Sequence, residues 1–122
     1  MRESGEDYLE KIYVLSRQKA DVHASDVAAA LGFSKPSVTR ATGILRSDGF
    51  IEIDSNKHII LTPKGLQKAE EIVERHRIIT KFWVLNGVNA ATAEKDACRM
   101  EHDISQETFL RIKKIVEAGE NA

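Results

Sequence analysis

The sequence has very little cysteine or proline. Its single cysteine, Cys98, cannot form a disulfide within the chain, so the fold has to rest on a hydrophobic core. Only 2 of the 122 residues are proline, and 42% are hydrophobic against 30% charged. This balance is that of a globular protein and not of a disordered chain. The length is sufficient for a core without disulfides or a structural metal.

Long apolar runs are absent as well. No stretch approaches the roughly 20 consecutive apolar residues that are needed to cross a bilayer. The first seven residues, MRESGED, are mostly charged and contain no apolar signal region. We therefore expect a cytoplasmic protein with no membrane contact.

An excess of either charge is also missing, since the formal net charge is −1. Proteins that coat nucleic acids through bulk charge are usually strongly basic, so this class is disfavoured. Any contact with DNA has to be made by a local group of side chains.

Hydrophobic periodicity and capping residues predict a mainly α-helical fold. An amphipathic helix is expected over residues 6–17, and a short one over 25–31 with Ser25 or Ala24 near its N-cap. Ser34 caps a third helix that ends at residues 47–49, with Val38, Ala41, Ile44 and Leu45 predicted to face inward. Further helices are expected over 63–84 after the N-cap Thr62, over 90–103, and after the N-cap Ser105.

Two short extended runs, residues 50–53 and 58–61, follow the third helix and read as a hairpin. Three helices followed by a hairpin are the order of a winged helix-turn-helix, whose third helix enters the major groove of DNA. The outward side chains near the start of that helix are of types that contact phosphates and base edges. The predicted DNA-binding residues are Ser34, Lys35, Pro36, Ser37, Thr39 and Arg40, with Lys57 in the hairpin. The alternative is a polar helix face that is merely solvated.

A second group of side chains has the chemistry of a metal site. Asp7 and Glu10 are spaced to project from one face of the first helix. Near the other end of the chain, the predicted fifth helix would carry four donors along one face, namely Glu94, Cys98, Glu101 and His102. Thiolate, carboxylate and imidazole groups that converge can bind a divalent transition metal. These residues also have simpler interpretations: Cys98 as a small buried hydrophobic residue, Glu101 and His102 as surface groups, Asp7 and Glu10 as complements to the dipole at the start of the first helix, and His76 as a core histidine.

The sequence resembles the diphtheria toxin repressor family of metal-dependent regulators, with its iron-dependent and manganese-responsive branches. The matching segments are EDYLEKIY from Glu6, SKPSVT from Ser34, LTPKG from Leu61, RHR from Arg75 and ACRMEH from Ala97. The resemblance implies a winged helix-turn-helix in residues 1–64 and a helical metal-binding and dimerisation region in residues 65–122. It implies homodimers that bind palindromic double-stranded operator DNA when metal is present, and a short form without the SH3-like domain of longer members.

Carried over to this sequence, the resemblance implies a principal metal site of Asp7, Cys98, Glu101 and His102, joined by Glu10 and His76. Asp7 and Glu10 match the manganese branch, whereas Cys98 matches the iron branch, so the expected cofactor is Fe(II) or Mn(II). The ancillary site of the iron branch has a carboxylate at the position of Thr80 and a histidine at the position of Glu94. That site is either absent or rebuilt around Glu94 and His76.

The sequence therefore predicts a metal-activated repressor of iron or manganese homeostasis genes, and not an enzyme. One alternative is a winged-helix regulator that senses an organic ligand or thiol oxidation at Cys98. Another is a small metallohydrolase, which is disfavoured because no substrate pocket or phosphate loop is recognisable.

Overall fold

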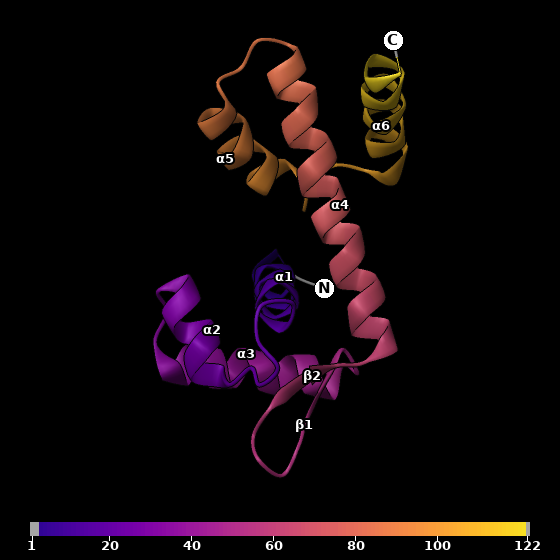
Figure 1. The fold of residues 1–122 in the computed structure, drawn as a ribbon. Helices are drawn as coiled ribbons and strands as arrows, with labels where there is room; N and C mark the ends of the chain where they lie inside the picture. Colours follow the sequence, from indigo (N-terminus) through magenta and orange to yellow (C-terminus); the bar gives the residue numbers. More distant parts are fainter. Residues whose placement is uncertain (1–2, 122) are drawn as a thin grey trace. The chain divides into compact units, whose positions relative to one another are not determined.

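A computed structural model of the chain describes residues 3–121, and the prediction about the N-terminal segment falls partly on residues 1–2, outside that range. The described residues form six helices and one two-stranded hairpin (Figure 1). Their bounds are α1 Glu3–Ser16, α2 Ala24–Leu31, α3 Lys35–Ser47, β1 Ile51–Ile53, β2 Ile59–Leu61, α4 Pro63–Leu85, α5 Ala90–Met100 and α6 Gln106–Glu120. No helix within residues 3–121 is long and apolar enough to cross a membrane.

The chain divides into two compact units, Met1–Glu70 and Glu71–Ala122, and α4 contributes residues to both. The first unit contains α1, α2, α3 and the hairpin. Its core is formed by fully buried aliphatic residues from each of these elements, including Leu9, Ile12, Val27, Val38, Leu45 and Ile51. The antiparallel strands pair Ile51 with Leu61 and Ile53 with Ile59. The predicted three helices and hairpin are thus all present.

Two details of the first unit differ from the sequence-based predictions. The N-cap of α2 is His23, and not Ala24 or Ser25, because the Asp26 carboxylate accepts a hydrogen bond from the His23 backbone N–H at 2.8 Å. On α3, Ile44 is 56% exposed, whereas Thr42 is buried. The buried face of α3 therefore follows Val38, Thr42 and Leu45, and the Thr42 hydroxyl is satisfied by donating to the Thr39 carbonyl oxygen at 3.1 Å.

The second unit packs the C-terminal part of α4 with α5 and α6. Its core consists of Ile78, Ile79, Ala97, Phe109, Ile112 and Val116. Ser105 caps α6 as predicted, since its hydroxyl accepts the Thr108 N–H at 3.1 Å. The prediction that the fifth helix continues to residue 103 was wrong: α5 ends at Met100, and a turn follows. The Trp83 indole N–H donates a hydrogen bond to the Met100 sulfur at 3.1 Å. This bond links α4 to the end of α5.

Candidate nucleic-acid interface and metal centre

The N-terminal turns of α3 present the predicted DNA-binding side chains to solvent. Ser34, Lys35, Pro36, Ser37, Thr39 and Arg40 are all exposed. Ser34 also has a structural role, because its hydroxyl caps the helix by accepting the Ser37 N–H at 3.3 Å. Since the N-terminus of a helix carries unpaired N–H groups and partial positive charge, this end of α3 is suited to a phosphate.

The tip of the hairpin is ordered by Asp54. Its carboxylate accepts the backbone N–H groups of Asn56 at 2.9 Å and His58 at 2.8 Å. The His58 N–H is the main cause that lowers the pKa of Asp54. Lys57 lies at the turn with a positive φ of 63° and is exposed. The turn thus holds the Lys57 backbone and leaves its ammonium group free to reach a phosphate.

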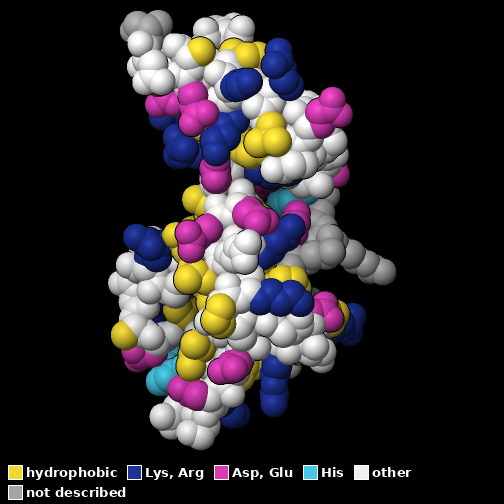
Figure 2. Space-filling view, turned by 90° about the vertical axis from the view of Figure 1, so that its right-hand side faces the viewer, with side chains coloured by type: hydrophobic (Ala, Val, Ile, Leu, Met, Phe, Trp, Pro, Cys, Tyr) yellow, Lys and Arg dark blue, Asp and Glu magenta, His cyan; other side chains and the backbone are white. Residues whose placement is uncertain are grey.

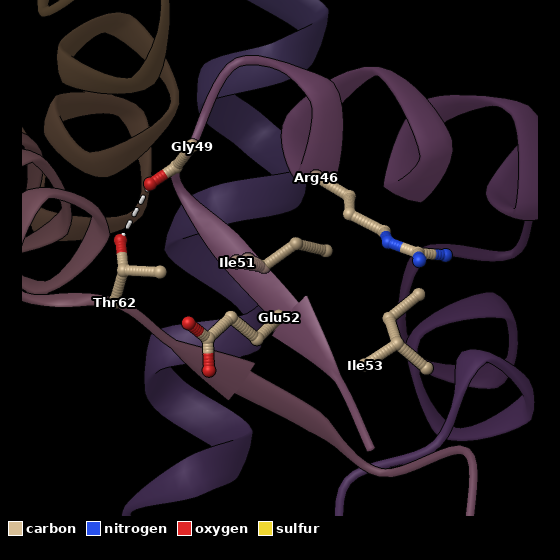
Figure 3. Close-up of a pocket in the computed structure, with 6 residues that line it drawn as sticks. All are labelled: Arg46, Gly49, Ile51, Glu52, Ile53 and Thr62. Atoms are coloured by element: carbon tan, nitrogen blue, oxygen red, sulfur yellow. Dashed lines mark hydrogen bonds between the residues drawn. The ribbon is translucent and has the colours of Figure 1, made fainter. Parts of the chain in front are cut away.

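The base of the hairpin is joined to the end of α3. The Thr62 hydroxyl donates to the Gly49 carbonyl oxygen at 2.7 Å (Figure 3), and the Lys64 ammonium donates to the Asp48 carbonyl oxygen at 2.8 Å. An exposed arginine of α3, Arg46, lines a shallow pocket between the helix and the hairpin. Arg46, in the last turn of α3, was not among the predicted DNA-binding residues.

Charges of both signs are mixed on one face of the molecule. Figure 2 shows Lys and Arg side chains beside Asp and Glu side chains over the face that it presents. This agrees with the formal net charge of −1.

A cluster of possible metal ligands lies within the second unit. His76 of α4, Cys98 of α5 and Glu101 just after α5 bring ligand atoms within 4.8 Å of one another. The His76 Nδ1 and Glu101 Oε2 atoms are 2.9 Å apart. The distant RHR and ACRMEH segments therefore meet in space, so that an imidazole, a thiol and a carboxylate converge on one point.

The Glu101 carboxylate has surroundings that suit a cation. Glu101 is only 3% exposed, and its Oε1 atom accepts no hydrogen bond within the described residues. His102 Nε2 lies 3.4 Å from this oxygen. A buried carboxylate oxygen without a donor is costly unless a positive charge compensates it. The donor set of nitrogen, sulfur and oxygen therefore fits a divalent transition metal.

Not every predicted ligand joins this cluster. Because α5 ends at Met100, Glu101 is the C-cap of the helix and His102 follows in the turn. Cys98 and Glu101 still bring ligand atoms within 4.8 Å of each other, as their spacing predicted. Glu94 is exposed and stands outside the three-residue cluster. Asp7 and Glu10 lie on α1 of the first unit and are half-buried. The interpretation of Cys98 as a buried hydrophobic residue was wrong, because Cys98 is exposed.

One further residue, which was not predicted from the sequence, supports the cluster. The Arg75 guanidinium donates to the carbonyl oxygens of Glu101 and Ile104 at 3.1 and 2.9 Å. Nothing in the local sequence marks this role, since an arginine next to a histidine in a long helix is an ordinary surface residue.

The fold and these two sites define a winged helix-turn-helix DNA-binding protein with a helical metal-binding region. Residues 1–59 match the DNA-binding domain of the iron-dependent repressors, and residues 62–121 match their metal-binding and dimerisation domain. The chain belongs to the iron-dependent repressor family, and the resemblance to the diphtheria toxin repressor family is confirmed. It is a DNA-binding transcriptional regulator of the metal-dependent class.

Individual relatives agree with this assignment. The transcriptional regulator MntR of Salmonella typhimurium is 40% identical over 108 residues, which cover 88% of this chain and 69% of that protein. The HTH-type transcriptional regulator MntR of Geobacillus thermodenitrificans is 34% identical, with 93% of this chain and 81% of that protein covered. The crystal structure of the metal-dependent transcriptional regulator MtsR superposes with a TM-score of 0.86 at 29% identity. The match covers 93% of this chain but only 53% of the MtsR chain, so the sequence spans about half of that structure.

Proposed function

We propose that this chain is a metal-activated repressor of iron or manganese homeostasis genes, and that the His76, Cys98 and Glu101 cluster is the centre of its activating site. The observation that carries the proposal is the buried Glu101 carboxylate, which has one oxygen 2.9 Å from His76 and the other without a hydrogen-bond donor in the described residues. Such an arrangement costs free energy in a protein that never binds a cation there.

Three further residues complete the proposed ligand set of this site, and a fourth is proposed for a second ion. His102 follows Glu101 directly and has its Nε2 atom 3.4 Å from the carboxylate. Asp7 and Glu10 are the acidic residues of α1 that the family resemblance implies. Glu94, which is exposed on α5, is the candidate for a second ion shared with His76.

The donor set supports Fe(II) or Mn(II) as the cofactor. Carboxylates suit manganese, imidazole suits most divalent transition metals, and a thiolate favours softer ions. A structure with a TM-score of 0.81 and 27% identity to this chain is that of the manganese regulator SloR. Cys98 is the residue that we expect to shift the preference from manganese toward iron.

The proposed ligands explain how a metal would control DNA binding. Asp7 and Glu10 belong to the DNA-reading unit, whereas His76, Cys98, Glu101 and His102 belong to the helical unit. A metal that binds one conformation of the protein better than another shifts the protein toward that conformation, and such differential binding is what allostery requires.

We propose that the active form is a homodimer on a palindromic operator in the cytoplasm. The match to a dimerisation domain over residues 62–121 supports a second copy of the chain as the partner. Leu110 and Ile115 of α6 are 49% and 52% exposed and offer apolar surface for this contact. A two-fold dimer presents two copies of α3 and therefore reads two inverted half-sites.

The proposal is tested by measuring DNA binding under anaerobic conditions with no metal, Mn(II), Fe(II) and Zn(II). The probe is a duplex selected from a random-sequence pool by the metal-loaded protein. We expect tight binding only when metal is present, and a palindromic selected sequence. Equal binding in the presence of a chelator would contradict the proposal, and a response to a thiol oxidant instead of metal would favour the redox alternative at exposed Cys98.

The Cys98→Glu variant tests the ligand role of the sulfur. A carboxylate should move the ratio of Mn(II) to Fe(II) activation toward manganese, because a harder ligand replaces a softer one. Cys98→Ser is the matched control of similar size and should weaken activation by both metals. Equal metal preferences in folded wild-type and Cys98→Glu proteins would remove Cys98 from the site.

A further inference from the structure

We propose that Arg75 is the positioning residue of the metal centre: it fixes the segment after α5 so that the Glu101 carboxylate stays against His76. The inference rests on the proposed function, since it assigns a role in the same site. It concerns a residue that is not itself a metal ligand and that offers no lone pair to a cation.

The end of α5 needs hydrogen-bond donors from outside the helix. The last carbonyl groups of an α-helix have no partners within it. Glu101 is the C-cap of α5, and its backbone N–H donates to the Ala97 carbonyl oxygen at 2.9 Å. Its own carbonyl oxygen points beyond the helix, into the turn that leads to α6. A donor from another element is therefore required to hold this residue in one place.

The Arg75 guanidinium supplies that donor. One nitrogen, Nη1, donates to the Glu101 carbonyl oxygen at 3.1 Å and to the Ile104 carbonyl oxygen at 2.9 Å. The other, Nη2, donates to Gln106 Oε1 at 2.8 Å. The guanidinium carbon also lies 5.1 Å from the centre of the Phe109 ring. A single side chain of α4 thus holds the whole connection between α5 and α6, and its positive charge lies favourably at the C-terminal end of α5.

Arg75 and His76 are consecutive on α4 and hold the same residue in two ways. Arg75 binds the main chain of Glu101, and His76 lies 2.9 Å from its side chain. Both contacts with Glu101 come from adjacent residues of α4. This one turn of α4 therefore sets the distance between the His76 imidazole and the Glu101 carboxylate. Because Glu101 is not itself within a helix, loss of the Arg75 contacts would free its backbone and increase the entropy that metal binding has to remove.

The chemistry of the three hydrogen bonds requires arginine. A guanidinium offers five N–H donors in a fixed plane, whereas lysine offers a point charge with no such plane. We therefore expect Arg75→Lys to keep the charge near Phe109 and to lose the simultaneous contacts with Glu101, Ile104 and Gln106.

Cobalt(II) titration of the metal-free full-length protein tests the inference. We expect Arg75→Ala to weaken cobalt and manganese affinity by about 10- to 100-fold, the usual effect of losing a residue that orients a metal ligand. Arg75→Lys should fall between Arg75→Ala and the wild type. The midpoint of the titration should shift. The sulfur-to-cobalt charge-transfer band and the visible cobalt bands should also change in shape, since the ligand geometry is altered.

Arg77→Ala is the matched control, because Arg77 is an exposed arginine on the same helix. It should leave affinity and spectrum unchanged. Wild-type affinity and spectrum in Arg75→Lys, which retains the charge and most of the packing, would overturn the positioning role even if Arg75→Ala fails to fold. Failure of the wild type to bind cobalt stoichiometrically would instead overturn the proposed function itself.

Discussion

The two units of this chain carry their functional groups in opposite ways. In the first unit the candidate DNA-binding residues are exposed side chains on a helix whose other face is buried through Val38, Thr42 and Leu45. In the second unit the central candidate metal ligand is the carboxylate of Glu101, a residue that is 3% exposed and lies at a helix end. A surface that reads DNA needs only a rigid support, whereas a metal site needs ligands that converge from separate elements.

This difference predicts different responses to mutation. Changes in the core of the first unit should act on stability and change DNA binding only through the fold. Changes around Glu101 should act on metal affinity even where the fold is intact. Four experiments test this contrast, beginning with the largest expected effect.

Leu45→Ala should destabilise the protein by about 2–5 kcal/mol, because it removes a fully buried side chain of α3 and leaves a cavity. Ile44→Ala is the neighbouring control. Ile44 is 56% exposed, so its truncation should change stability by no more than about 0.5 kcal/mol. Urea unfolding followed by circular dichroism measures both values. Equal losses would mean that the buried face of α3 has been assigned incorrectly.

Glu101→Gln should lower manganese and cobalt affinity by at least about 100-fold, because the neutral amide has nearly the same shape but lacks the charge that a cation requires. Stability without metal should be nearly retained, since the amide keeps an oxygen acceptor beside His76 and the charge on the oxygen that accepts no hydrogen bond is removed. Glu94→Gln, on an exposed position of α5, is the control. Calorimetric titration gives the affinities, and full metal binding by Glu101→Gln would exclude this carboxylate as a ligand.

Arg40→Ala should weaken binding to the selected duplex by about 1–3 kcal/mol if Arg40 contacts a base edge. If Arg40 contacts only a phosphate, binding should weaken evenly across sequences and the salt dependence should fall by about one charge. Metal affinity should not change in either case, and the same holds for Lys35→Ala. Fluorescence anisotropy at several salt concentrations distinguishes the outcomes. Unchanged operator affinity in both variants would remove α3 from the recognition role.

Acidification should loosen the tip of the hairpin, with the smallest effect of the four. The backbone N–H of His58 is the main cause that holds the pKa of Asp54 below its usual 3.8. The stabilisation is therefore complete above pH 3.8 and is lost as the pH falls through the lower pKa of the folded state. Amide chemical shifts of Lys57 and His58 report this change. Asp54→Asn keeps an oxygen acceptor but cannot titrate, so the same transition in that variant would rule out Asp54 as its source.

The sequence by itself determined most of the fold. The caps Ser34, Thr62 and Ser105 were predicted correctly, because each places a hydroxyl where a helix begins with unpaired N–H groups. The hairpin followed from two short apolar runs around a polar turn. The exposed side chains of the first turns of α3 followed from helical periodicity, which depends only on neighbours in the chain. Ile44 was misplaced because an apolar residue was assumed to be buried and a threonine was not.

The metal site depended on tertiary structure. The sequence listed His76, Cys98 and Glu101 as candidates, but their convergence requires α4 and α5 to pack in one particular way. The end of α5 at Met100 was not predictable from its own residues, because the turn that follows is held by Arg75, 26 residues away from Glu101 in sequence. Local patterns report which face of a helix is apolar. They carry no information about which distant side chain satisfies the helix end, and only the packed structure settles that.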